Sequence, residues 1–146
     1  MTRRGFTLIE MLMVIVIIGA VGVIMFPRLS GELNRQNVRS ARQAITALHA
    51  RARASAIQRA RATSLIRDGN EIRIESRHPV TGAVDTIGTP LDVSTSHGGV
   101  AMTWTRDVLT FDPRGIGIEG TSTRIIVSRP NFADTLVISA VGSIVQ

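Results

Sequence analysis

Three histidines and one serine are the side chains whose types first suggest catalysis or metal binding. His49, His78 and His97 lie far apart, in one expected helix and two expected loops, and the chain contains no cysteine. Zinc sites need closely spaced His or Cys ligands, so we expect no metal centre. Ser96 precedes His97, but no G-x-S-x-G elbow accompanies it. The sequence therefore predicts a protein that is not an enzyme, with no catalytic residues and no cofactor.

Glu10 is the only charged side chain in a long apolar run. The run extends from Phe6 to Phe26, is interrupted only by Thr7, Glu10 and glycines, and ends at Pro27. As a helix it reaches about 30 Å, which is the thickness of a hydrocarbon core, so it is predicted to span a membrane. Burying a carboxylate there costs about 2.5–3.5 kcal/mol on insertion scales. Glu10 therefore requires a cationic partner from outside the run.

The leader, residues 1–5, suggests such a partner. Arg3 and Arg4 precede Gly5, and cleavage after Gly5 would leave a positively charged amine on Phe6. This amine, or the same amine of a neighbouring subunit, would reach Glu10 and neutralise it. Pairing between subunits would also direct their assembly.

Two simpler interpretations compete with cleavage after Gly5. Ala20-Val21-Gly22 resembles the small-residue site of a secretory signal peptide, but Glu10 lies in what would be its apolar core. A plain single-pass anchor explains the length of the run but neither the Gly5-Phe6 pair nor Glu10. Charge alone does not fix the orientation, because arginines lie on both sides of the run.

A basic stripe follows the apolar run. Arg35, Arg39, Arg42 and Arg53 recur at helical spacing beside His49, and the chain has a net charge of +6. Clustered cations attract polyanions such as DNA. The lone tryptophan offers little base stacking, so we favour a solvated face and keep DNA binding as the alternative.

The elements that position these residues are one long helix and a set of strands. Because Pro27 removes one helical hydrogen bond, the helix is predicted to be either kinked or briefly interrupted over Arg28–Gly31. Residues 28–62 continue it as an amphipathic segment, whose apolar stripe comprises Val38, Ala41, Ile45, Leu48, Ala52 and Ala56.

Beyond Ala62 the apolar period changes from helical to two, which predicts strands. The fold class is α+β: a long N-terminal helix, membrane-spanning in its first half (6–27), packed on an antiparallel β head (63–146). The expected strands are 63–67, 71–77, 84–87, 91–93, 100–105, 108–111, 124–128, 135–139 and 144–145.

Residues Arg3-Arg4-Gly5-Phe6-Thr7-Leu8-Ile9-Glu10 resemble the leader shared by type IV pilins and type II secretion pseudopilins. The resemblance implies that prepilin peptidase cleaves between Gly5 and Phe6 and methylates Phe6, and that Glu10 aids subunit docking. It also implies a single-pass protein of the bacterial inner membrane, with the leader in the cytoplasm and the head in the periplasm.

The second half, through residues 48–68, the run Phe111-Asp112-Pro113-Arg114-Gly115 and a terminal hairpin, is similar to the GspH/FimT branch of minor pilins and pseudopilins. The resemblance implies a structural subunit that joins other pilins in a filament and supports protein secretion across the outer membrane. Some FimT-like members instead bind DNA through an Arg-bearing C-terminal motif. Residues 135–146 contain no arginine, which disfavours that role here.

Overall fold

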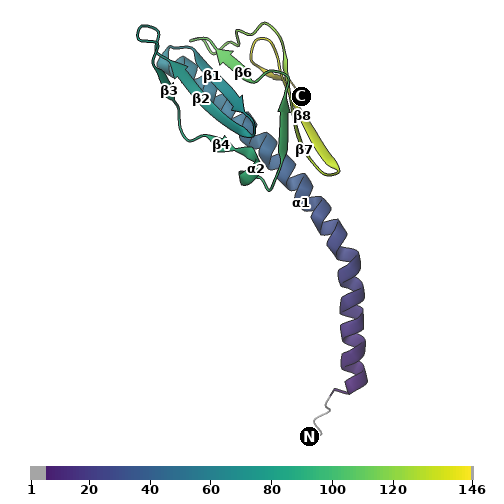
Figure 1. Cartoon of the computed structure of the whole chain (residues 1–146). Helices are drawn as coiled ribbons and strands as arrows, with labels where there is room; N and C mark the ends of the chain where they lie inside the picture. The colour runs from purple at the N-terminus through teal and green to yellow at the C-terminus, as the bar shows by residue number, and fades with distance from the viewer. Residues whose placement is uncertain (1–5, 146) are drawn as a thin grey trace.

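The computed structural model describes residues 6–145, and for residues 24–28 it describes the helix but not the side chains. One long helix, α1 (Leu8–Arg59), carries a head of strands on its C-terminal half, while its N-terminal half extends away from the head (Figure 1). Its 52 residues span about 80 Å at 1.5 Å per residue. The predicted arrangement of a long helix and a C-terminal antiparallel β head is confirmed.

Local chemistry sets both ends of α1. Thr7 is the N-cap, and its Oγ1 accepts a hydrogen bond of 3.3 Å from the backbone N–H of Glu10. With Glu10 three residues later, Thr7 has the sequence of a capping box. At the other end Ala60 adopts a left-handed conformation, with φ 49°, and α1 ends at Arg59 rather than at the expected Ala62.

The helix is continuous through residues 27–31, so of the two alternatives for Arg28–Gly31 the interruption is wrong. A proline removes one helical hydrogen bond, but the bonds on either side can hold the helix together. Figure 1 shows α1 bending below the head without breaking. Pro27, the predicted kink, lies among the residues whose side chains the structure does not describe.

The strands form two antiparallel sheets, a division that the sequence pattern did not indicate. The first has the order β3-β2-β1-β6, with β4 also paired to β2, and the second has the order β5-β7-β8-β9. The strands of the first are β1 (Thr63–Asp68), β2 (Glu71–Arg77), β3 (Val84–Thr86), β4 (Leu91–Asp92) and β6 (Val108–Phe111); those of the second are β5 (Ala101–Trp104), β7 (Thr123–Arg129), β8 (Phe132–Ile138) and β9 (Ile144–Val145).

A short helix, α2 (Val93–Ser96), replaces the end of the strand expected over 91–93 and the loop expected after it. Asp92 Oδ1 accepts hydrogen bonds from the backbone N–H groups of Ser94 at 2.8 Å and Thr95 at 3.1 Å. An aspartate in this position is a strong N-cap, which turns the chain into a helix.

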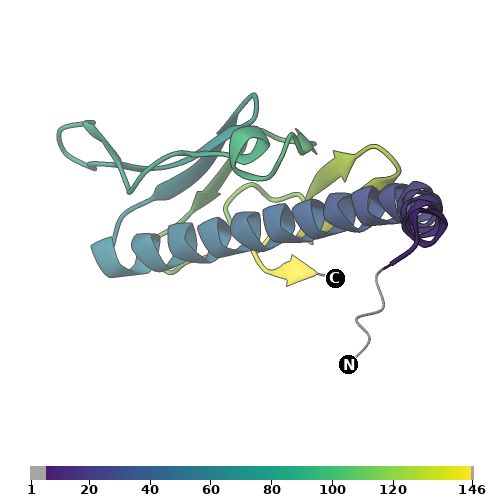
Figure 2. The same ribbon diagram turned by 90° about the horizontal axis from the view of Figure 1, so that it is seen from below.

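The core lies where α1 meets strands of both sheets, and Figure 2 shows the head folded along its C-terminal half. The predicted apolar stripe faces this core: Val38, Ala41, Ile45, Ala52 and Ala56 are buried, and Leu48 is half-buried against them. His49, which we expected beside the arginines, is instead 4% exposed. His49 follows Ile45 by four residues and precedes Ala52 by three, which places it on the same inner face as these two buried residues.

Candidate functional site

The N-terminal part of α1 is apolar on all sides. Every residue from Phe6 to Val23 is exposed, and Leu8 and Ile17 expose 83% and 61% of their surfaces. A helix that is apolar around its whole circumference is normally buried, so this segment requires an environment that the isolated chain does not supply. Within the described residues, no helix has an apolar stretch long enough to cross a membrane.

Glu10 lies in the first turn of α1, near the positive end of the helix dipole. Its backbone N–H is capped by Thr7, but within the described residues its carboxylate forms no ion pair. Phe6 is 77% exposed and precedes the helix. Gly5, the residue predicted to precede the cleavage site, lies outside the described part of the chain.

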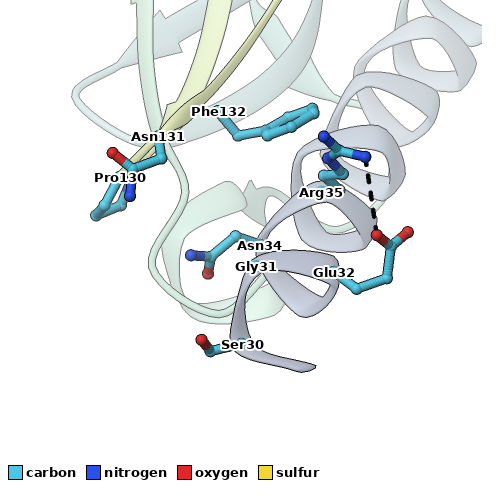
Figure 3. A pocket seen from close by; sticks show the side chains of 8 residues that line it. All are labelled: Ser30, Gly31, Glu32, Asn34, Arg35, Pro130, Asn131 and Phe132. Carbon is cyan, nitrogen blue, oxygen red and sulfur yellow. Dashed lines mark ion pairs between the residues drawn. The ribbon is translucent and has the colours of Figure 1, made fainter. Parts of the chain in front are cut away.

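The predicted basic stripe is partly neutralised. Arg42 Nη1 donates to Asp134 Oδ2 at 3.1 Å. Arg35 lies 3.9 Å from Glu32 and stacks over the Phe132 ring at 4.6 Å from its centroid (Figure 3). The sequence did not indicate these partners, because Asp134 and Phe132 lie on β8, almost a hundred residues downstream. Arg39 and Arg53 form no ion pair with any described residue and are exposed.

Three shallow cavities follow one another along α1. The first, of about 560 Å³, lies between residues 30–35 and residues 130–132 (Figure 3). The second, also of about 560 Å³, is lined by Arg39, Arg42 and Asp134, and the third, of about 350 Å³, by His49 and Arg53. The arginines of the stripe are therefore divided among three hollows.

His49 is a core histidine. Its ring packs edge-on against Phe111, with centroids 5.2 Å apart, and its Nε2 has no hydrogen-bond partner among the described residues. Burial lowers the pKa of His49, the positive charge of Arg53 lowers it further, and a hydrogen bond with the backbone of Gly142 opposes them. The ring is therefore neutral near pH 7.

A serine and a histidine do meet, although not the pair adjacent in sequence. Ser40 Oγ lies 3.0 Å from His97 Nδ1, on the loop after α2. The same hydroxyl lies 3.0 Å from the carbonyl of Asn37, to which it can donate. Whether Ser40 Oγ or His97 Nδ1 donates in their contact depends on the tautomer of the ring. The contact joins the loop after α2 to α1.

No cluster of three or more His, Cys, Asp or Glu side chains suited to a metal ion occurs in the described portion of the chain. The exposed surfaces of α1 are the candidate functional sites.

Comparison with known proteins gives two family models and one solved fold. The model for the prokaryotic N-terminal methylation motif matches residues 1–26, and that for the type II transport protein GspH matches residues 41–142. Two crystal forms of the type IV minor pilin FimU of Pseudomonas aeruginosa are similar at 21% identity, with TM-scores of 0.58 and 0.55. They match 76% and 73% of this chain and 88% and 90% of the FimU chains. No curated protein sequence matches.

Both the fold and the extent of the GspH match define a pilin-like subunit. The chain belongs to the GspH family of minor pseudopilins and minor pilins. This confirms the resemblance seen in the leader and the head.

Proposed function

We propose that the chain is a minor subunit of a type II secretion pseudopilus, stored in the bacterial inner membrane with its head in the periplasm and inserted into a filament through α1. One observation carries the proposal: the N-terminal part of α1 exposes apolar side chains on every side and bears a single carboxylate in its first turn. A filament core or a bilayer would cover such a surface.

Glu10 would select the axial position of the subunit. After cleavage by prepilin peptidase between Gly5 and Phe6, the methylated amine of Phe6 would remain cationic. In an apolar bundle an unpaired carboxylate is expensive, and a neighbouring subunit's amine would relieve that cost only at one axial position. Thr7 already caps the Glu10 N–H, which leaves the carboxylate available for this pairing.

The description of the matched family, a type II transport protein, supports protein secretion across the outer membrane as the process served. The similarity to the type IV minor pilin FimU shows a shared fold. The alternative proposal is that the same assembly mechanism inserts the chain into a type IV pilus. Deletion of the gene would separate the two: loss of secreted proteins with intact surface pili supports secretion, and the reverse result supports a pilus.

Mass spectrometry of the protein purified from membranes tests the maturation step. We expect the N-terminal peptide to begin at Phe6 and to carry one added methyl group. A strain without prepilin peptidase is the control and should retain residues 1–5. A polypeptide that still begins at Met1 when the peptidase is present contradicts the proposal.

A further inference from the structure

The outer edge of β8 is only partly covered. β8 pairs with β7 from Phe132 to Ile138, whereas β9 pairs only with Val137 and Ile138. In the described part of the chain, no strand pairs with this edge over residues 132–136. The hairpin of β7 and β8 lies on the side of the head that carries the C-terminal end (Figure 1).

The backbone of this edge presents hydrogen-bonding groups outward. The Thr135 N–H donates to Asp134 Oδ1 at 2.8 Å, so it points away from β7. In an antiparallel strand the groups of alternate residues point to the same side, which places those of Ala133 with those of Thr135. Such an edge is a template for another strand.

Asp134 acts as a latch on this edge. Its Oδ1 accepts from the Thr135 N–H, while its Oδ2 accepts from Arg42 Nη1 at 3.1 Å. The side chains of Asp134 and Arg42 are about 70% buried, since they expose 28% and 29% of their surfaces. The carboxylate thus occupies the amide that an added strand would use.

The surface beside the edge could receive side chains of such a strand. The cavity of about 560 Å³ between α1 and β8 is lined by both apolar and basic side chains. The apolar side chains include Ala47, Ala50 and Leu136, and the basic side chains are those of Arg39 and Arg42. Alternate side chains of a strand placed beside residues 132–136 would point toward this cavity, because the side chains of β8 that share its face contact α1.

Charge indicates the occupant. Arg39 is exposed and has no ion-pair partner among the described residues, and releasing the latch would free Arg42 as well. A second copy of this chain, with a net charge of +6, would bring like charge to these arginines. We propose that the open edge of β8 binds an extended, acidic segment of a different protein chain, added as a strand in line with β9.

Recognition of this kind takes affinity from backbone hydrogen bonds and specificity from pockets for alternate side chains. Binding of an added strand requires a prior change at Asp134, because its carboxylate must first release the Thr135 N–H. The inference needs neither the membrane nor a filament, and so does not depend on the proposed function.

The test uses the full chain in neutral detergent and fluorescent seven-residue peptides. The probe is Thr-Val-Glu-Val-Glu-Val-Thr; one control carries Lys in place of Glu, and another is N-methylated on alternate amides. We expect anisotropy to show binding of the probe at least tenfold tighter than of either control. Hydrogen exchange at Ala133 and Thr135 should slow when the probe binds.

Variants assign the binding to the edge. Thr135→Pro removes the outward N–H and should weaken binding at least tenfold, whereas Asp134→Ala opens the latch and should strengthen it. Arg39→Glu, on the exposed helix surface, should reverse the preference between the Glu and Lys peptides even if Thr135→Pro misfolds. Arg77→Glu on β2 carries the same charge change and should have no effect. Absence of probe binding, or equal binding of the N-methylated peptide, overturns the proposal.

Discussion

Glu10 and Thr7 are close enough in sequence to serve two roles at once. Thr7 Oγ1 holds the Glu10 N–H and starts α1, which explains the residue pair without any partner subunit. The carboxylate itself forms no ion pair with the described residues. The proposed role of Glu10 in assembly therefore depends on its carboxylate charge, whereas its role in starting the helix depends on its backbone N–H.

Glu10→Gln separates these roles, because it keeps the size and hydrogen-bonding capacity of the side chain but removes the charge. We expect normal cleavage after Gly5 and a decrease of about tenfold or more in filament incorporation, since a hydrogen bond to a charged group contributes about 1.5–3 kcal/mol. Immunoblots of sheared filaments and of membranes measure the ratio of filament-incorporated to membrane-bound protein. Glu32→Gln, the same change on exposed helix surface, should incorporate normally; equal incorporation of both variants would reject charge pairing by Glu10.

His49 makes the stability of the head depend on pH. Because burial lowers the pKa of His49 below its ordinary value of 6.5, the unfolded chain binds a proton before the folded chain does. The free energy of unfolding should therefore fall as the pH decreases from 7.5 through 6.5 toward the folded pKa. Urea unfolding at several pH values measures this slope.

His49→Gln should remove the contribution of His49 to that slope, whatever its effect on stability at pH 7.5. His78→Gln, in the loop after β2, controls for the loss of one histidine and should leave the contribution in place. Identical slopes in the wild type and in His49→Gln would contradict the assignment.

Among the elements, those with regular periodicity were predicted well. The helical stripe from Val38 to Ala56 and the strand alternation in β1, β2, β7 and β8 arise from side chains that alternate between the core and solvent. Two features escaped the pattern. The division into two sheets depends on which strands pair at long range, and α2 contains too few residues for a period.

The partners of the arginines escaped for the same reason. Arg42 and Asp134 are separated by 92 residues, and only the packing of β8 on α1 brings them together. A sequence shows that a helix carries a basic stripe, but neutralisation of that stripe depends on tertiary contacts. Glu10 and the Gly5-Phe6 pair differ in this respect, because the motif that indicates them is contiguous in the sequence, over residues 3–10.

Ile45 tests the contact between α1 and the sheets. It is 1% exposed in the middle of the buried stripe, so Ile45→Ala should destabilise the head by about 2–5 kcal/mol. Leu33→Ala, at a site on α1 that is 51% exposed, should change stability by no more than about 0.5 kcal/mol. Urea unfolding of the full chain in detergent measures both; equal effects would mean that the head does not depend on this face of α1.

For the whole molecule, the net charge of +6 makes weak attraction to DNA an expected background. Dedicated DNA capture would require Arg39 and Arg53 to act together with Arg35 and Arg42, which already contact Glu32 and Asp134. We therefore expect weak binding that decreases steeply with salt. A mobility-shift titration of the full chain at two salt concentrations measures it.

Arg39→Glu with Arg53→Glu should weaken the residual binding no more than the same change at Arg77 and Arg124, two arginines on the sheets that form no ion pair in the described structure. A selective loss in the helix double variant, with affinity that persists at the higher salt, would favour DNA capture over a role in secretion.

The same helix forms both the stalk and one wall of the core of the head. A pull on the N-terminal end would therefore be transmitted through the continuous helix to Val38, Ile45 and their neighbours, because no flexible linker separates the two halves of α1. Rotation of the stalk would likewise turn the head with it. A subunit of this design would transmit push, pull and torque from the N-terminal helix to the head. The head would unfold under such a force only when the contacts between α1 and the strands break.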